Sequence, residues 1–271
     1  MNTDRPNPES VLLERHGHVA VLRLNQPERL NPLGLPLQER LRDVLRELAR
    51  DTGVRALVIT GAGKAFCVGA DLTSLQSPPT GQSLGEQTSE IMLRLSNQLI
   101  EDLRALPFPV VSAVNGPCAG AGVGLALAAD VVVAARSAYF YLSFMPRLGI
   151  VPDLGSTWFL ERFIGRPRAV AMSLLGERIS AEQAHSWGLI WACVDDAALP
   201  DEALQLAERL ARLPAHAARE IRHAFDSASQ QGLSTQLQYE ARRQRELIDK
   251  PEFKEGVSAF LQKRDPQFPG R

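Results

Sequence analysis

The sequence predicts an α/β fold built from parallel βα units. Short, continuous apolar runs, typical of strands buried on both faces, alternate with amphipathic helical patterns over the first part of the chain. Beyond residue 200 helical patterns follow one another with no strand between them. This change predicts a βα domain over residues 1–197 and a helical domain over residues 198–271, with the boundary at the break near Pro200.

The individual elements follow from local patterns. Two apolar segments flank Gly17 within residues 11–24, which predicts a β-hairpin. Three later apolar runs predict buried strands: 56–60, 110–114 and 130–134. Apolar residues at helical spacing predict the following helices: 35–50, 88–105, 122–129, 201–213, 215–231 and 234–249. Residues 76–87 are rich in Pro, Gly, Gln and Ser, which predicts a loop that controls access to a site.

Composition excludes several classes of protein. The chain of 271 residues is 45% hydrophobic and 23% charged, which is ordinary for a soluble globular protein. Its 30 basic and 31 acidic residues give a net charge of −1, without the basic excess of nucleic-acid-binding proteins. The longest apolar run contains Asp130 and is too short to span a bilayer, and the N-terminus lacks an apolar signal core. We therefore expect a cytoplasmic protein with neither nucleic acid nor membrane as a partner.

Cysteine and histidine give no sign of nucleophilic or metal chemistry. Cys67, Cys118 and Cys193 are far apart, which predicts small packed residues in a reduced compartment rather than disulfides or a metal site. None of the five histidines falls between residues 19 and 184. The glycine-rich stretches lack G-x-G-x-x-G in register after a strand, so we expect no NAD.

Two small-residue turns are the strongest chemical signal in the chain. Residues 63–72 follow the strand predicted at 56–60, and residues 115–122 follow the strand predicted at 110–114. Such turns can point backbone N–H groups at one spot, and two of them around one oxygen form an oxyanion hole. With Asp153 further along the chain, the pattern indicates chemistry on a carbonyl. Asp153 has a second interpretation, as the cap of the helix that follows it.

The chain resembles the crotonase family, the enoyl-CoA hydratases and isomerases. Four motifs carry the resemblance: LNQPERLNPL at 24–33, AFCVGADL at 65–72, AVNG at 113–116 and EGVSAFLQKR at 255–264. The resemblance implies a crotonase-like spiral of βαβ units with a C-terminal helical trimerisation region, assembled as a homotrimer or a dimer of trimers. It also implies an acyl-CoA thioester substrate, with coenzyme A as part of that substrate and no separate cofactor or metal.

The resemblance assigns roles to particular residues. The backbone N–H groups of Ala70 and Ala121 would bind the thioester oxygen. Ala121 adds a Cβ where the family often has glycine, so we expect a negative or mildly strained φ there. The other implied acyl-CoA contacts are Ala65, Asp71, Leu72, Leu75, Gly120 and Met145. Apolar candidates for the pocket lining, which suit an aliphatic or aromatic acyl group, are Leu75, Met92, Phe140, Phe144 and Met145.

Charged and C-terminal residues have two open interpretations each. Arg29 and Lys64 would bind the phosphates of coenzyme A, or are solvated surface charges. Phe260 and Lys263 would approach the coenzyme A of a neighbouring subunit. Alternatively, Phe260 packs in a trimer and Lys263 faces solvent. For Asp71 a structural hydrogen bond or a helix start is favoured over a catalytic role.

The chain departs from the hydratases of the family at both of their glutamates. Their positions correspond to Gly124 and Met145, and neither residue can move a proton. Asp153 remains, in a segment similar to that of Δ3,Δ2-enoyl-CoA isomerases and of isomerases from bacterial phenylacetate breakdown. One base suffices for a double-bond shift. We therefore expect an acyl-CoA isomerase with Asp153 as its single acid/base, its pKa raised by desolvation.

Three alternatives stay open. The chain could be an enoyl-CoA hydratase, if another acid replaces the glutamates. It could use Asp153 as a nucleophile, as in the related chlorobenzoyl-CoA dehalogenases, although those also need a His and a Trp, and Met145 stands at the Trp position. It could also be a CoA-thioester-binding member of the family with little turnover.

Overall fold

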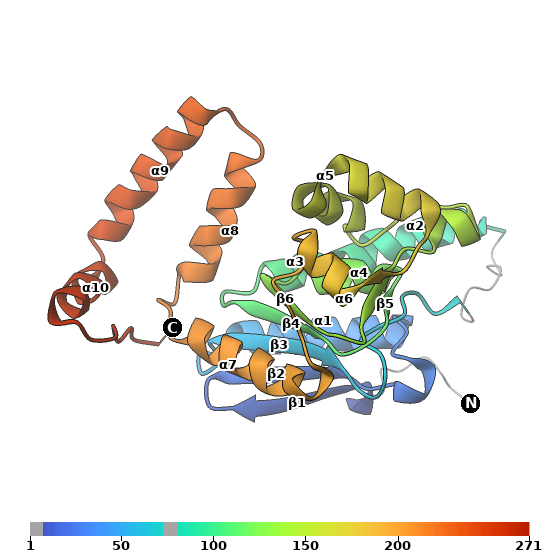
Figure 1. The fold of residues 1–271 in the computed structure, drawn as a ribbon, viewed down its shortest axis with the longest axis horizontal. Helices are drawn as coiled ribbons and strands as arrows, with labels where there is room; N and C mark the ends of the chain where they lie inside the picture. The colour runs from blue at the N-terminus through green and yellow to red at the C-terminus, as the bar shows by residue number, and fades with distance from the viewer. Residues whose placement is uncertain (1–7, 73–80, 271) are drawn as a thin grey trace.

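The computed structural model describes residues 8–72 and 81–270, and a six-stranded sheet forms its centre (Figure 1). In spatial order the strands are β1 (Val11–His16), β2 (Val19–Leu24), β3 (Ala56–Gly61), β4 (Val110–Val114), β6 (Val131–Ala135) and β9 (Ala192–Val194). Only the β1–β2 hairpin is antiparallel, and every other neighbouring pair in this sheet is parallel. The predicted α/β class, hairpin and three buried strands are confirmed.

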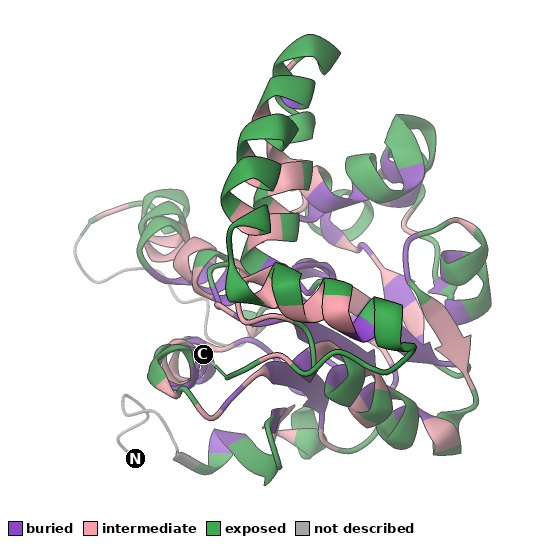
Figure 2. Ribbon diagram, turned by 90° about the vertical axis from the view of Figure 1, so that its left-hand side faces the viewer, coloured by how far each residue is buried: buried purple, intermediate pink, exposed green. Residues whose placement is uncertain are grey.

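Helices cover the middle of this sheet, and its central strands β3 and β4 are accordingly apolar along most of their length. Every residue of β3 and β4 is buried. The helix α1 (Leu35–Arg50) has the predicted bounds and directs six buried residues inward. The helix α7 (Leu199–Ala211) packs against four strands of the sheet. Figure 2 shows the result: buried strands at the centre and exposed outer faces on the helices.

A second, three-stranded sheet was not predicted. It contains β5 (Cys118–Ala119), β7 (Tyr139–Tyr141) and β8 (Ile179–Ser180), with β5 parallel to β7. Strands of two or three residues are too short to produce a periodic pattern, so the sequence gives no warning of them. This sheet matters because β5 lies within the second small-residue turn.

The predicted loop over residues 76–87 is wrong in its last part. Residues 76–80 lie outside the described residues, but α2 (Leu84–Ile91) begins earlier than expected. Ser83 and Glu86 form a capping box in which each side chain accepts a hydrogen bond from the other's backbone N–H, at 3.2 and 2.8 Å. This S-x-x-E pattern was the missed signal. A π-helical turn, η4 (Met92–Ser96), then joins α2 to α3 (Asn97–Arg104).

The C-terminal helices form an arm that extends from the body of the molecule (Figure 1). The remaining helices are α4 (Ala121–Leu127), α5 (Ser156–Leu175), α6 (Ala181–Ser186), α8 (Ala217–Ala228), α9 (Leu233–Ile248) and α10 (Pro251–Gln262). We call α8, α9 and α10 the C-terminal arm. Although α7 lies beyond residue 197, it packs on the main sheet, and the boundary at 197–198 stays a prediction. Of the described helices, none is long and apolar enough to cross a membrane.

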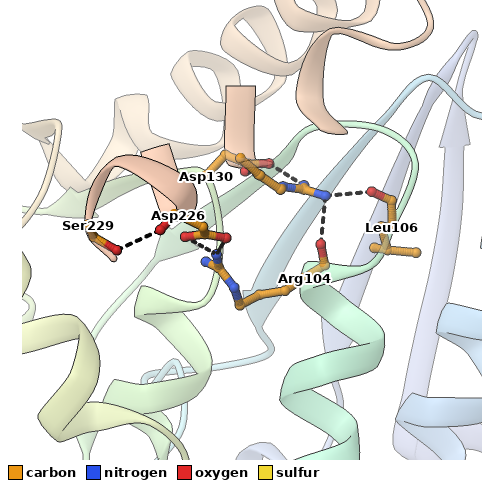
Figure 3. Close-up of polar contacts among 6 residues, drawn as sticks. Arg104, Leu106, Asp130, Asp226 and Ser229 are labelled. Carbon is orange, nitrogen blue, oxygen red and sulfur yellow. Dashed lines mark hydrogen bonds and ion pairs between the residues drawn. The ribbon is translucent and has the colours of Figure 1, made fainter. Parts of the chain in front are cut away.

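One arginine fastens the arm to the body. Arg222 of α8 has a side chain only 10% exposed, and its guanidinium binds the carboxylate of Asp130, with Nε 2.6 Å from Oδ1. The same group donates to the backbone oxygens of Arg104, Leu106 and Phe108. Figure 3 shows Asp130, Arg104 and Leu106 converging on this contact. A single side chain thus ties α8 to the end of α3 and to the start of β6.

We predict that Arg222→Met lowers the free energy of unfolding by about 3 kcal/mol, because it removes the cationic partner of a partly buried carboxylate and a donor from three carbonyls. Among the described residues, the carboxylate of Asp130 would keep only the backbone N–H of Val110 as a hydrogen-bond donor. Urea titration followed by circular dichroism measures this change. Arg136→Met is the control, since its partners Glu182 and Asp195 are largely exposed. Equal, small effects of the two substitutions would show that the contacts of Arg222 contribute no more to the free energy of unfolding than a surface ion pair does.

Candidate active site

A buried asparagine shapes the first small-residue turn. Asn31 is 0% exposed, and its Nδ2 donates to the backbone oxygens of Ala62 and Ala65 at 3.0 and 2.8 Å. Its Oδ1 accepts the backbone N–H of Gln26 at 2.8 Å. The amide therefore supplies hydrogen bonds to irregular backbone that no sheet or helix satisfies.

Asn115 holds the same turn from the second strand. Its Oδ1 accepts the backbone N–H of Gly61 at 3.1 Å, and its Nδ2 donates to the oxygen of Gly63 at 3.1 Å. Asn31 and Asn115 were part of the sequence motifs, but their role in fixing the turn was not predicted. The only signal in the sequence was an asparagine next to Pro32 and another next to Gly116, and it is weak because Asn is common in exposed turns as well.

The two small-residue turns lie against each other. The backbone N–H of Ala119 donates to the oxygen of Cys67 at 2.9 Å. Gly69 has φ +92°, and a Cβ built on it would lie 2.9 Å from the oxygen of Ala119 and 3.0 Å from the nitrogen of Ala121. Only glycine permits both this backbone conformation and this contact. The structure therefore brings the predicted pair of turns together.

Two backbone donors remain free at this contact. Neither Ala70 nor Ala121 donates its N–H to another residue in the described ranges 8–72 and 81–270. The N–H of Gly120, by contrast, is bound to the oxygen of Tyr141 at 2.9 Å. Gly120 takes the positive φ of +52°, so Ala121 begins α4 with a negative φ, as expected. Free N–H groups on adjacent turns are the arrangement that an oxyanion hole requires.

A tight turn brings Asp153 to this region. Leu154 and Gly155 both have left-handed backbone, with φ +48° and +76°. The buried Leu154 packs on α4 at Gly124, where a Cβ would overlap the oxygen of Leu154 and lie 2.9 Å from its Cβ. Gly124 lies three residues after Ala121, or about 5 Å along the helix axis. The loop that carries Asp153 therefore sits about one helical turn from the second free donor.

The carboxylate of Asp153 is desolvated. Its Oδ1 is buried and has no hydrogen-bond partner among the described residues. Burial raises the pKa of Asp153 from 3.8 to about 6. The alternative that Asp153 caps the following helix is wrong, because α5 has Gly155 at its N-cap and no side-chain cap bond. A carboxyl group in such a place can accept and release a proton near neutral pH.

An apolar groove borders the Asp153 loop. Its volume is about 280 Å³, and its lining includes Met145, Val151, Pro152, Thr157 and Leu160. Glu161 and Arg166 also line this groove. Met145 belongs to the π-helical turn η5 (Phe144–Leu148), whose Phe144 is buried beside Gly120. Phe140, expected in the pocket lining, is 0% exposed and belongs to the core instead.

Only some of the residues predicted to bind coenzyme A lie at the first small-residue turn. Arg29 forms an ion pair with Asp71 at 2.7 Å, so the favoured structural interpretation of Asp71 is supported. Ala65 is buried, whereas Lys64 and Leu72 are exposed near the first turn. Leu75 lies outside the described residues.

The C-terminal candidates lie elsewhere within this chain. Phe260 is 83% exposed on α10, and Lys263 follows at the end of that helix. Figure 1 shows α10 at the far end of the arm from α4 and α5. A contact of these two residues with a ligand at the Asp153 site of the same chain is therefore not formed, and a contact with a neighbouring subunit stays a prediction.

The cysteines near the turns are unsuited to nucleophilic chemistry. Cys67 and Cys118 are both fully buried, as predicted. Burial raises the pKa of Cys67 to about 12, and it also raises the pKa of Cys118. A thiol that stays protonated is a poor nucleophile, so Asp153 is the ionisable group best placed for chemistry at this site.

Comparison with known proteins gives a consistent assignment. Residues 14–271 match the family model described as enoyl-CoA hydratase/isomerase. The chain is 46% identical to the 1,2-epoxyphenylacetyl-CoA isomerase of Escherichia coli, over 97% of this chain and 99% of that protein. It is 41% identical to a probable enoyl-CoA hydratase of Rhodobacter capsulatus, over 93% and 95%. A crystal structure of a Mycobacterium abscessus putative enoyl-CoA hydratase/isomerase superposes with a TM-score of 0.88 at 36% identity, covering 96% and 100%.

We predict that Asp153→Asn stabilises the folded protein at pH 8 by roughly 2 to 3 kcal/mol and has little effect near pH 3.5. The raised pKa means that the folded state disfavours the charged carboxylate, so the wild-type protein loses stability as pH rises from about 3.8 to about 6. The amide has no charge to desolvate. Urea unfolding of both proteins at the two pH values measures the difference. An equal effect at both values would contradict the desolvation of Asp153.

Proposed function

Since the chain belongs to the enoyl-CoA hydratase/isomerase family, we propose that it is a one-base acyl-CoA isomerase with Asp153 as its acid/base. The observation that carries the proposal is the combination of two free backbone donors with a single desolvated carboxylate beside them. The substrate would be an acyl-CoA thioester, as the family implies.

The proposed reaction moves one proton between two carbons. The carboxylate of Asp153 takes a proton from C2 of a 3-enoyl thioester, and the electrons of that C–H bond pass into a dienolate. The negative charge collects on the thioester oxygen, where the N–H groups of Ala70 and Ala121 would stabilise it. One such donor typically contributes about 3 kcal/mol to lowering the barrier. Asp153 then returns the proton to C4, which yields the 2-enoyl thioester with no net gain or loss of atoms.

The surroundings of Asp153 favour isomerisation over hydration. Adding water across a double bond needs groups that position the water and transfer its protons. The two candidate positions carry Gly124 and Met145, and a side chain at 124 would overlap the oxygen of Leu154. The loop that carries Asp153, called the base loop below, therefore fills the space beside α4 that the side chain of a second carboxylate would need. Hydratase activity remains the alternative, because several relatives are named probable enoyl-CoA hydratase and one is named 2,3-dehydroadipyl-CoA hydratase.

A second candidate substrate comes from the comparisons. The relative with 46% identity is named for an epoxide of phenylacetyl-CoA, and its similarity extends over 97% of this chain. An apolar groove next to Asp153 is compatible with an aromatic acyl group as well as with an aliphatic one. We therefore include 1,2-epoxyphenylacetyl-CoA beside the enoyl esters as a substrate to be assayed.

The remaining parts of the proposal concern binding and assembly. Arg29 and Lys64 are exposed near the first turn, where they could contact the phosphates of coenzyme A. The arm exposes Phe225 by 73% and Phe260 by 83%, which supports burial of this surface in a homotrimer or a dimer of trimers. The contribution of Phe260 and Lys263 to a neighbouring site, and a cytoplasmic location, belong to the same proposal.

We predict that Asp153→Asn abolishes isomerisation, with kcat at least about 1,000-fold lower, while thioester binding stays within about threefold of wild type. The amide keeps the shape of the side chain but cannot take a proton. The measurement follows 3-enoyl-CoA, 2-enoyl-CoA and 1,2-epoxyphenylacetyl-CoA in parallel. Calorimetry with a thioether analogue reports binding.

Each outcome of this assay selects one alternative. Isomerisation that survives in the variant would sink the Asp153 mechanism. Rapid addition of water to 2-enoyl-CoA by the wild-type protein would identify a hydratase. Tight binding of the thioether without turnover of any of the three esters would identify a binding protein.

The pH dependence of activity gives an independent prediction. The base must be ionised, so kcat/KM should fall as the pH drops through about 6, the pKa of Asp153 in the free protein. Initial rates between pH 4.5 and 8 measure the position of this acid limb. A limb below pH 4.5 would mean that the reacting carboxylate is an ordinary solvated one.

A further inference from the structure

A second arginine connects the C-terminal arm to the body of the molecule, next to the contacts of Arg222. Arg104, the last residue of α3, directs Nη2 at the carboxylate of Asp226 on α8, at 2.8 and 3.1 Å from its two oxygens (Figure 3). The backbone oxygen of Arg104 accepts a hydrogen bond from Arg222 at 2.9 Å. Both the main chain and the side chain of Arg104 are thus positioned by α8.

The same guanidinium reaches the first turn of α5. Its Cζ lies 5.2 Å from the ring centre of Trp158 and 5.7 Å from that of Phe159. The two rings pack edge to face, with their centres 5.1 Å apart. Arg104 is about a quarter exposed, so this cation–π contact is partly shielded from water. Arg104 therefore contacts α8 through Asp226 and α5 through two aromatic rings.

One of the two rings, that of Phe159, packs directly against the turn that follows Asp153. Phe159 is 2% exposed, and a Cβ on Gly155 would lie 2.9 Å from its Cε2 atom. Gly155 supplies one of the two left-handed residues that follow Asp153. The backbone oxygen of Asp153 accepts a hydrogen bond from the backbone N–H of Ser156, the first residue of α5, at 2.9 Å. A shift of this first helical turn would move the carboxylate.

We propose that Arg104 is a positioning residue for Asp153, which couples the seating of the C-terminal arm at Asp226 to the orientation of the base loop through Trp158 and Phe159. This inference rests on the proposed function, since it assigns Arg104 a part in the proton transfer by Asp153. Arg104 itself touches no reacting atom. Its effect is on geometry, and a misplacement of reacting groups by 1 Å can cost on the order of 100-fold in rate.

The chain offers a matched control on the opposite side of the same ring. Arg162 lies closer to Trp158, with Cζ 3.8 Å from the ring centre, and it donates to the backbone oxygen of Trp158 at 3.2 Å. Arg162 is exposed, and within residues 8–72 and 81–270 it makes no hydrogen bond or ion pair with α8. Removing it takes away a cation–π contact with Trp158 while leaving the connection from Asp226 to α5 intact.

The test compares Arg104→Gln, Arg104→Lys, Asp226→Asn and Arg162→Gln in the full-length protein. The concentration of folded binding sites is first measured by titration with a non-reactive thioether of coenzyme A. Rates are then expressed per folded site, so that partial unfolding of a variant is not mistaken for a slower reaction. We expect Arg104→Gln and Asp226→Asn to lower kcat per site about tenfold, with KM within about twofold of wild type. Arg104→Lys keeps the charge and should recover most of the rate.

The acid limb of the pH profile is the readout that a merely structural defect would not move. A loosened loop admits water, so the limb should shift from about 6 towards 3.8 in Arg104→Gln. The elements beside Asp153 carry few ionisable groups, and α4 has none. They are Arg147 on η5 and, on α5, Glu161, Arg162, Arg166 and Arg168. Arg162→Gln therefore also controls for a direct effect of charge on the limb.

The outcomes separate the inference from the function on which it rests. If wild-type protein isomerises 3-enoyl-CoA and Asp153→Asn does not, the proposed function stands. In that case, equal rates and limbs for Arg104→Gln and Arg162→Gln would overturn the role of Arg104. A normal rate in Asp226→Asn beside a slow Arg104→Gln would overturn the coupling to the arm. If Asp153→Asn retains full activity, the function and the inference both fall.

Discussion

The contact between the two small-residue turns is the constraint on which the rest of the site depends. It requires that Gly69 have no Cβ, because an added Cβ would lie 3.0 Å from the nitrogen of Ala121 and 2.9 Å from the oxygen of Ala119. Once the turns meet, the free N–H groups of Ala70 and Ala121 lie on adjacent backbone. Asn31 and Asn115 keep the first turn in place by bonding its carbonyls from two different elements. The two turns start at the same edge of the central sheet, because they follow the C-terminal ends of β3 and β4, which are parallel neighbours.

The desolvated carboxylate of Asp153 shows how stability and reactivity oppose each other here. A buried carboxylate oxygen without a partner destabilises the fold at neutral pH, yet the same burial brings its pKa to about 6. Two left-handed residues, Leu154 and Gly155, hold it there at a further conformational cost of about 1 kcal/mol for the leucine. Packing of Leu154 on α4 and of Phe159 beneath Gly155 offsets these terms. The site is therefore a strained loop fixed by a well-packed surround.

Much of this fold follows from sequence pattern, and the parts that do not have a common physical reason. The hairpin, α1 and the buried strands β3, β4 and β6 are long enough to show their periodicity, and all were predicted. The strands β5 and β7 have two and three residues and show none. The pair of turns and Asp153 were recognised from small-residue runs and from the family resemblance. The bonds of Asn31 to Ala65 and of Arg104 to Asp226 join residues 34 and 122 positions apart, and local patterning carries no information about such partners.

The proposed site binds the thioester through backbone groups and transfers the proton through a side chain. This difference has an evolutionary consequence. Both groups proposed to hold the thioester oxygen are peptide N–H groups, which every residue except proline possesses. Proton transfer, in contrast, depends on one side chain at position 153 and on what stands at positions 124 and 145. A lineage can therefore change the reaction by a few substitutions around the acyl group without losing its hold on the thioester. Relatives named for isomerases and for hydratases within one family are the outcome that such a separation favours.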